Sequence, residues 1–463
     1  MTQTVFADFD ELRMAMTGPV FTHGDPGYEA ARSMFNGAID RHPAAVARVS
    51  GPVDVAAALR FAQANGLEVT VRGGGHSTAG SGVRDGALMI DLGALRQVVV
   101  DPRARLARAG GGATLAELDA ATQGHGLAVP AGLISHTGIG GLTLGGGMGW
   151  LTPVAGLSID NLESLEVVLA DGRCVRASDT ENPDLFWALR GGGGNFGVVT
   201  EFTYRLHEVG PLVGFGLQFF DLHQVPDVLH AVRDAAPELP REVVVFVLGI
   251  NAPPAPFVPQ EHRFRPGVAL AVVGFGADEA HADAMQRFRS SAPPLFESVG
   301  PVPYVELQKL SDGANEWGTF AYEKSVFVDD LTDDVVAVFD QYLRAKPTPH
   351  CEIIIYSLGA GYADAADDAT AFGGRRTARW CPTIVGAASD AEELGVAREW
   401  VRSCWDAFRA VSDWGGAYVN GNADPDDAQM RRSYGPKYER LARIKAEYDP
   451  GNVFHRNPNI KPA

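Results

Sequence analysis

The sequence predicts an α+β protein that is divided into two or three domains. A chain of 463 residues is longer than one simple domain usually is. Up to about residue 205, short helices and strands alternate with runs of glycine, whereas longer strands and helices dominate from residue 206 to about 415. Hydrophobic residues make up 46% of the chain, which is enough to fill a core in each region.

In the first region a helix and a strand lead directly into a glycine turn. Residues 52–62 have helical spacing, with Asp54 near the N-terminal end. Residues 67–72 alternate as a strand does and run straight into residues 73–77, which read GGGHS. Because glycine has no Cβ, such a turn leaves backbone N–H groups free to point at a phosphate, although an ordinary tight turn has the same sequence.

Two more glycine runs follow. Residues 132–149 read GLISHTGIGGLTLGGGMG, and residues 191–197 read GGGGNFG after a predicted helix over residues 184–189. A strand is predicted again over residues 198–204. The nicotinamide fingerprint GxGxxG fits poorly, because Thr143 stands where its third glycine belongs and the usual βαβ setting is lacking.

Residues 206–415 predict a domain that combines a sheet with helices. The patterns of apolar residues predict strands over residues 242–250, 268–274 and 352–358, and helices over residues 334–344 and 391–411. The proline-rich residues 251–259 predict a loop. In the tail, the sequence DPGN at residues 449–452 predicts a turn.

Composition and charge exclude several kinds of partner. The net charge is −18 and the pI is near 5.1, and such a surface repels nucleic acid and anionic membranes. A membrane span needs about 20 apolar residues in a row, and no such stretch occurs. The acidic N-terminus does not read as a signal peptide. We therefore expect a cytoplasmic protein that binds neither nucleic acid nor membrane.

The sequence lacks the motifs of several other enzyme classes. No lysine follows a glycine, so there is no Walker A loop, and neither GxSxG nor HExxH occurs. The four cysteines, Cys174, Cys351, Cys381 and Cys404, are widely spaced without a CxxC pair. We expect no metal site and no disulfide framework, but buried free thiols.

His76 is singled out by its position in the chain. It closes the strand–glycine turn, and small residues follow it from Ser77 to Gly82. An imidazole at this place would be held rigidly beside whatever the glycine turn cradles. The other histidines are scattered, and we expect residues such as His42, His230 and His281 to be ordinary surface or core residues.

Several motifs, in this order along the chain, resemble one known family. They are VRGGGHS at residues 71–77, the glycine run at residues 132–149, the block from residue 160 to residue 200, and the tail motifs YVN and YERL that begin at Tyr418 and Tyr438. They resemble the berberine bridge enzyme-like oxidases, within the superfamily of p-cresol methylhydroxylase and vanillyl-alcohol oxidase. In the middle of the chain only YEKS, which begins at Tyr322, is similar.

The resemblance implies a two-part FAD-binding domain of the p-cresol methylhydroxylase type, with an inserted substrate domain made of an antiparallel sheet covered by helices. The domain would comprise residues 1–205 and 417–463, and the insertion residues 206–416. The cofactor would be FAD, bonded at its 8α-carbon to His76, which prevents its loss and makes it a stronger oxidant. The cofactor-binding residues that the family implies are Arg72, Gly73, Gly74, Gly75, His76, Ser77, Gly82, Thr137, Gly138, Gly140, Gly141, Gly145, Gly147, Gly149, Gly197, Val199, Tyr418 and Asn420.

The resemblance also implies a reaction class. The family removes hydride from a small organic molecule, which here would be an alcohol, a sugar, an amine or a natural-product intermediate. The flavin supplies the redox chemistry and is usually reoxidised by O2 with release of hydrogen peroxide. Two alternatives are a dehydrogenase that passes electrons to another acceptor and a flavin-bearing binding protein without turnover.

The sequence departs from the family pattern in two loops. Many relatives form a second bond to the flavin from a cysteine, where this chain has Ile134, so we predict a single covalent link. His136 either lines the flavin pocket or packs its own loop. Thr137 stands where some relatives have the residue that gates oxygen, and its modest size is compatible with oxygen access. Gly421 stands where many relatives have a catalytic tyrosine.

A catalytic base would then come from the middle domain. The candidates are Tyr322, Lys324, Glu352 and Tyr356, and strand alternation places the last two on one face. A structural role would explain each of them as well. An amine substrate would need no base, since a neutral amine can give up hydride directly.

Overall fold

A small, mostly parallel sheet carries the first glycine turn. The structure is a computed structural model that describes residues 7–414 and 416–463. The predicted helix forms α3 (Pro52–Ala64), and the predicted strand forms β3 (Val69–Arg72), which ends directly before the glycines. The sheet has the order β1-β2-β4-β3, with the remaining strands β1 (Val20–Thr22), β2 (Ala45–Arg48) and β4 (Leu88–Asp91).

The second sheet of this region is antiparallel. Its order is β5-β6-β10-β8-β9, with β5 (Val98–Asp101), β6 (Leu106–Gly110), β10 (Val198–Arg205), β8 (Leu162–Val168) and β9 (Cys174–Ser178). The helix predicted before the third glycine run is α7 (Pro183–Leu189), and the strand predicted after it is β10. A large apolar core lies between this sheet and the helices and loops that cover it.

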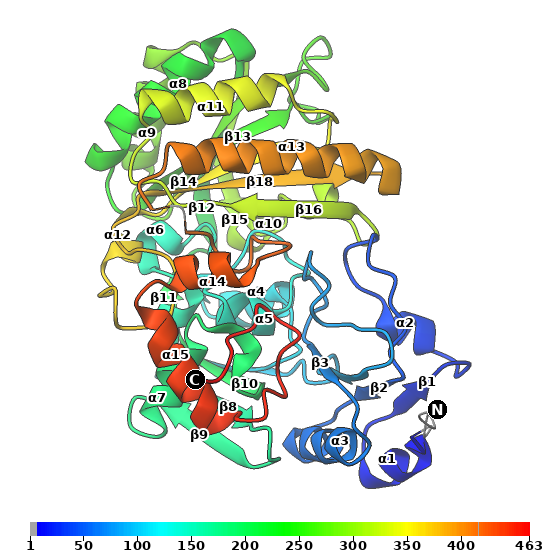
Figure 1. The fold of residues 1–463 in the computed structure, drawn as a ribbon. Coiled ribbons are helices and arrows are strands. Elements are labelled where there is room, and N and C mark those ends of the chain that lie inside the picture. Colours follow the sequence, from blue (N-terminus) through cyan, green and yellow to red (C-terminus); the bar gives the residue numbers. More distant parts are fainter. Residues whose placement is uncertain (1–6, 415) are drawn as a thin grey trace.

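The middle of the chain forms a seven-stranded antiparallel sheet. Its order is β15-β12-β14-β13-β17-β18-β16, with β15 (Phe296–Pro303), β12 (Leu212–Asp221), β14 (Pro266–Gly274), β13 (Val243–Asn251), β17 (Glu352–Ser357), β18 (Trp380–Ala388) and β16 (Phe320–Ser325). One face is covered by helices α8 (Val225–Ala235), α9 (Asp278–Ser291), α11 (Asp333–Arg344) and α13 (Ala391–Ala410), as Figure 1 shows. The strands and helices predicted here are confirmed.

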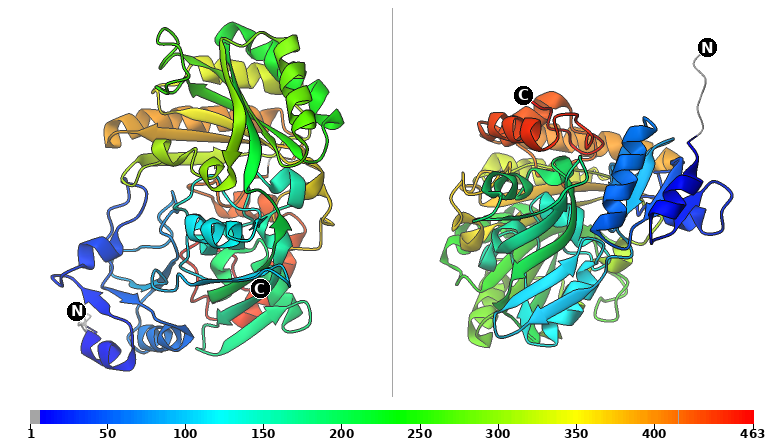
Figure 2. Two further views of the ribbon diagram at one scale, coloured as in Figure 1. Left: turned by 180° about the vertical axis from the view of Figure 1, so that it is seen from behind. Right: turned by 90° about the horizontal axis from the view of Figure 1, so that it is seen from below.

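The opposite face of this sheet looks toward the first region (Figures 1 and 2). Because side chains alternate along a strand, each strand of the sheet contributes to two cores. On β17, Ile353 and Ile355 pack with the helices, whereas Tyr356 packs against Phe246 on the other side, at 5.0 Å between ring centroids. Trp150, from the first region, stacks on Phe246 at 4.7 Å.

The tail returns to the first region, which confirms the two-part domain. Helix α14 (Asp427–Tyr434) leads into α15 (Lys437–Tyr448), which packs against α7 of the first region; Figure 1 shows both helices in red at the C-terminal end of the chain. The ammonium group of Lys445 is fully buried and donates to Asp449 and to the carbonyl of Asn195, each at 2.6 Å. Since Asn195 belongs to the third glycine run, the tail holds that run in place.

The boundaries drawn at residues 205 and 416 stay a prediction. The short strand β11 (His207–Glu208) still pairs with β7 (Leu127–Ala128) of the first region. The hydrogen bonding of the first region therefore extends a few residues beyond residue 205.

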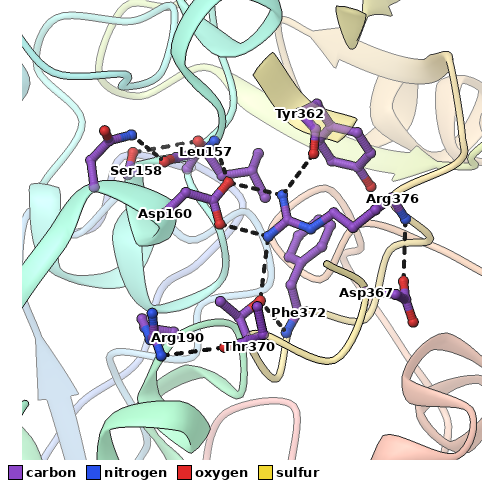
Figure 3. Close-up of polar contacts among 12 residues, drawn as sticks. Leu157, Ser158, Asp160, Arg190, Tyr362, Asp367, Thr370, Phe372 and Arg376 are labelled. Atoms are coloured by element: carbon purple, nitrogen blue, oxygen red, sulfur yellow. Dashed lines mark hydrogen bonds and ion pairs between the residues drawn. The ribbon is translucent and has the colours of Figure 1, made fainter. Parts of the chain in front are cut away.

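A buried ion pair fastens the inserted domain to the first region (Figure 3). Arg376 lies in the long connection between β17 and β18, and its guanidinium donates to both carboxylate oxygens of Asp160 at 2.6 and 2.9 Å. It also donates to the carbonyl of Tyr362 and to the hydroxyl of Thr370, each at 3.3 Å. Nearby, a Cβ at Gly191 would lie 2.4 Å from the Cα of Phe372, so this connection packs directly on the third glycine run.

The cysteines are free thiols, as predicted, but not all of them are buried. Cys174 is exposed on β9, because it stands at the edge of the second sheet, whereas the other three lie inside the protein. Within residues 7–414 and 416–463 no set of His, Cys, Asp and Glu side chains is arranged to hold a metal ion. None of the helices in these ranges is long and apolar enough to cross a membrane.

Candidate active site

A cavity of about 360 Å³ lies between the glycine loops and the face of the large sheet that the helices leave uncovered. All three glycine runs, the tail and strands β16 to β18 contribute to its wall. Most of the predicted site residues line it, namely Arg72, Gly73, Gly74, Gly75, His76, Ser77, Gly82, Thr137, Gly138, Gly140, Gly141, Gly145, Gly197, Val199, Tyr356, Tyr418 and Asn420.

The first two glycine loops touch each other through their backbones. A Cβ at Gly74 would lie 2.4 Å from the Cα of Gly138, and a Cβ at Gly138 would lie 2.2 Å from the backbone nitrogen of Gly74. Such distances are far below van der Waals contact, so neither position admits a side chain. The cavity wall at this point consists of backbone alone.

The first glycine loop has the chemistry that a pyrophosphate needs. Among the described residues, the backbone N–H groups of Gly73, Gly74 and Gly75 have no hydrogen-bond acceptor. All three residues line the cavity, so their N–H groups are free to donate to a ligand that accepts from consecutive backbone donors. The residues present therefore fit the phosphates of a dinucleotide cofactor.

His76 is held in an aromatic cluster at the edge of the cavity. Its ring stacks on Phe35 with 3.9 Å between centroids and an interplanar angle of 11°. Its Nε2 lies 3.2 Å from Nδ1 of His136, which leaves Nδ1 of His76 as the nitrogen that can form a bond. Burial, and the nearby His136, lower the pKa of His76 to about 3. The imidazole is therefore uncharged at neutral pH and able to act as a nucleophile.

The second glycine loop presents apolar and small side chains to the cavity. Ile134 and Thr137 line it, and among the described residues no cysteine does. His136 contacts the ring of His76 and so has a specific partner in the site.

Gly147 and Gly149 were expected to bind the cofactor, but the structure places them behind the cavity wall. The N–H of Gly147 donates to the hydroxyl of Tyr418 at 3.0 Å, and a Cβ there would lie 2.0 Å from Oγ of Ser158. At Gly149 a Cβ would lie 2.0 Å from the carbonyl oxygen of Ala131. Both glycines are needed for the turn of the loop, and Tyr418 links that turn to the tail.

The tail seals one side of the cavity. The amide of Asn420 donates to the carbonyl of Leu142 at 2.8 Å and to the hydroxyl of Tyr418 at 2.9 Å. Burial raises the pKa of Tyr418 to about 12, so its phenol stays protonated. Gly421, which replaces the tyrosine of many relatives, lies next to Ser325, and a Cβ there would be 3.2 Å from its Oγ.

Tyr322 and Lys324 face away from the cavity, toward helix α13. The hydroxyl of Tyr322 donates to Asp424 at 2.7 Å and accepts from Arg402 at 3.0 Å. The ammonium of Lys324 pairs with Asp424 at 2.6 Å and lies 4.6 Å from the ring centroid of Trp405. The predicted catalytic roles of these two residues thus have no support in the geometry, since neither residue lines the cavity.

Glu323, between them, is the residue that sequence reasoning missed. Alternation along β16 turns it to the opposite face, where it lines the cavity and accepts a hydrogen bond from Thr78 at 2.9 Å. Burial, opposed in part by that bond, raises the pKa of its carboxyl to about 7. The motif YEKS could have indicated this position, because side chains alternate along a strand and Glu323 must face the side opposite to Tyr322 and Lys324.

Strand β17 presents Glu352 and Tyr356 on the same face, as alternation predicted. Tyr356 lines the cavity, and among the described residues its hydroxyl has no hydrogen-bond partner. Glu352 does not line the cavity. In the sheet, Val385 of β18 lies between Glu352 and Glu323, because it pairs with Glu323 on β16 and with Glu352 on β17. Burial raises the pKa of Glu352 to about 7, and Lys346 opposes the rise.

The backbone cradle, the uncharged imidazole beside it and the two-part domain around them define a protein that binds a flavin dinucleotide. Two segments match family models: residues 43–178 match the model described as FAD binding domain, and residues 417–461 the model described as Berberine and berberine like. The chain belongs to the berberine bridge enzyme-like FAD-linked oxidases of the p-cresol methylhydroxylase and vanillyl-alcohol oxidase superfamily, and its cofactor is FAD.

Full-length relatives are enzymes. The chain is 30% identical over 467 residues to the (R)-6-hydroxynicotine oxidase of Paenarthrobacter nicotinovorans, with 97% of this chain and 98% of the relative covered. The 6-hydroxy-D-nicotine oxidase of Arthrobacter nicotinovorans has the same fold with a TM-score of 0.84 and 27% identity, over 97% of this chain and 99% of that one. For the glucooligosaccharide oxidase of Acremonium strictum, the TM-score is 0.86 and the identity 26%, over 98% and 99% of the chains.

Proposed function

We propose that this protein is an oxidase that carries FAD through one covalent bond to His76 and passes the electrons of a small organic substrate to O2. The observation that supports it best is the state of His76. Its imidazole is uncharged, held by Phe35 and His136, and lies at the end of a backbone loop that fits a pyrophosphate. The flavin supplies the two-electron chemistry, while the protein supplies position and electrostatics.

A single link is proposed because, among the described residues, the second loop has no cysteine at the cavity wall. The glucooligosaccharide oxidase above is described with 6-S-cysteinyl, 8α-N1-histidyl FAD, so that relative has both bonds. Here Ile134 lines the cavity, and its side chain cannot bond to a flavin. In His76, Nε2 contacts His136, so Nδ1 is the ring nitrogen that is free to bond to the flavin. Nδ1 corresponds to the N1 position named for the histidyl bond of that relative.

The residues proposed to touch the substrate are Glu323 and Tyr356. Both project from the large sheet into the cavity, opposite the glycine loops. Their side chains can accept or donate a proton, and no other residue of β16 or β17 lines the cavity. This replaces the choice of Tyr322 and Lys324.

The covalent link is tested by denaturing gel electrophoresis of the purified protein and its His76→Ala variant, followed by flavin fluorescence. We expect fluorescence that stays with the wild-type polypeptide and is absent from the variant. Flavin released by acid from the wild type would mean a noncovalent cofactor. Flavin that stays with the His76→Ala polypeptide would reveal a second link.

The acceptor is tested separately, on protein whose flavin content is known. A screen of alcohols, sugars and amines under anaerobic conditions identifies compounds that bleach the flavin. Oxygen consumption with such a compound, and equal formation of hydrogen peroxide, are the expected results, since Thr137 lines the cavity and its modest size is compatible with access of O2. Bleaching without reoxidation by O2 would favour the dehydrogenase instead.

A further inference from the structure

The carboxyl of Glu323 lies half-buried at the cavity wall and lacks a cationic partner. Its hydrogen-bond donor is the neutral hydroxyl of Thr78. Among the described residues, none of the ion pairs involves Glu323, even though its neighbour Lys324 is paired with Asp424 on the far side of the strand. Burying a carboxylate without a counter-charge is costly, so a site that keeps one has a cation to bring to it or a proton to move.

A second carboxyl strengthens the negative potential at this wall. Glu352 stands across Val385 from Glu323 on the same face of the sheet, and its charge adds to the rise in the pKa of Glu323. The positive charge that acts on Glu352 is that of Lys346, which lowers the pKa of Glu352 and so opposes the effect of burial. Tyr356 completes the wall, and its neutral phenol does not offset the charge.

Near the second loop most of the side chains that line the cavity are apolar, although Thr137 and Asn420 line it as well. The apolar side chains are Leu133, Ile134, Leu142, Met148 and Val419. A ligand that suits both parts of the wall has a cationic group and an apolar body. An alcohol or a sugar is uncharged and cannot form an ion pair with the carboxylates. A sugar would in addition lose hydrogen bonds, because its hydroxyl groups would lie against apolar side chains.

We propose that the substrate class of this oxidase is the amines, and that Glu323 binds the ammonium group and takes its proton. The inference rests on the function proposed above. The N–H bond of the ammonium breaks and its proton moves to the carboxylate of Glu323, so the nitrogen regains its lone pair. The neighbouring C–H bond then breaks, hydrogen and electron pair leave together as hydride to the flavin, and a C=N bond forms. The substrate is oxidised by two electrons to an iminium cation, and the flavin is reduced by two.

A pair of isosteric probes tests the proposal on the flavin-loaded protein. Cyclohexylmethylamine is a cation at neutral pH, and cyclohexylmethanol is its neutral counterpart of nearly equal size. Binding of each is measured without oxygen, from the change in the flavin absorption spectrum. We expect the wild type to bind the amine about tenfold more tightly or better, which is the worth of one charge-assisted hydrogen bond. In Glu323→Gln, which keeps the size of the side chain, the two affinities should become nearly equal.

Two further variants make the result specific. Glu306→Gln removes an exposed carboxylate of the same domain, and its preference for the amine should equal that of the wild type. Thr78→Val removes the hydrogen bond that holds Glu323 and should weaken the preference, which keeps the test open if the Gln variant does not fold.

The outcomes separate this inference from the function on which it rests. Absence of gel-stable flavin in the wild type would overturn the proposed function. Gel-stable flavin together with equal affinities for the two probes, or with no binding of the amine, would overturn the inference alone. So would a preference for the amine that survives unchanged in Glu323→Gln.

Discussion

The two walls of the cavity are built in opposite ways. The wall of glycine loops is made of backbone: Gly74 and Gly138 meet with no room for a Cβ, and N–H groups point at the ligand. The wall of strands β16 to β18 is made of side chains, and which of them faces the cavity depends on alternation. A backbone wall can be recognised from residue types, whereas a side-chain wall requires the phase of each strand.

The difference explains why the two walls are unequally predictable. A shift of one residue in the phase of a strand turns every side chain to the other face. The motif YEKS points to β16, but Tyr322 and Lys324 lie on the face toward α13, whereas Glu323 lies on the face toward the cavity. Four predictions test the contrast between the walls, beginning with the largest expected effect.

Replacing Gly74 with valine should remove the flavin and destabilise the protein. Its Cβ would lie 2.4 Å from Gly138, and backbone on both sides cannot move away at low cost. Overpacking of this kind costs about 3 kcal/mol or more. Flavin absorbance and thermal unfolding measure both effects. Gly395→Ala, in helix α13 where a Cβ meets open space, is the control and should keep the flavin. A stable Gly74→Val protein that keeps its flavin would contradict the close backbone contact between Gly74 and Gly138.

Arg376→Met tests how the two walls are held together. Removing the guanidinium leaves the largely buried carboxylate of Asp160 without its cationic partner, and breaking such a pair costs about 3–5 kcal/mol. The adjacent Arg375→Met breaks a half-exposed pair at 3.8 Å from Asp329 and should cost less than about 1 kcal/mol. Urea unfolding of both variants measures the difference. Equal losses would show that the connection is not fastened through Arg376.

Glu323→Gln and Tyr322→Phe test the phase of β16 directly. The first variant should lower kcat/KM for an oxidised amine about 100-fold, the usual contribution of a positioned acid–base group. The second removes a hydroxyl that contacts Asp424 and Arg402, so it should cost about 1 kcal/mol of stability and leave the rate unchanged. Steady-state kinetics on protein with matched flavin content decides. The reverse ranking would restore Tyr322 to the catalytic site.

The stability of Glu323→Gln should depend on pH, with the smallest effect of the four. The folded protein raises the pKa of Glu323 to about 7, chiefly through burial, whereas an unfolded glutamate titrates at about 4.3. The folded state therefore holds the proton more tightly, and wild-type stability falls as pH rises between these values. Below about 4.3 this penalty is absent, and above about 7 it is complete. The melting temperature of the variant should exceed that of the wild type at pH 8, and the gain should shrink toward pH 5. A gain that is constant with pH would mean that the carboxyl is not buried in this way.

Much of the fold and one wall of the site were predictable from the sequence. The helices at α3, α7, α11 and α13, the strand before the first glycine turn, and the second sheet domain all follow from periodicity and glycine punctuation. His76 was identified because it directly follows a strand and a glycine turn. Gly147 and Gly149 were grouped with the cofactor loop since a glycine that approaches a ligand and one that approaches its own chain look the same in sequence.

By itself, the sequence determined which loops can approach a ligand through their backbone, because the lack of a Cβ at positions such as Gly74 and Gly138 is a property of residue type. Only the tertiary structure decided the side-chain wall and its surroundings. The phase of β16 is set by its pairing with β18 and by the helices whose apolar side chains pack on the face of the sheet that points away from the cavity. The contact between His76 and His136, and the pair of Arg376 with Asp160, join residues that are distant in the chain, and no local pattern fixes which distant groups meet.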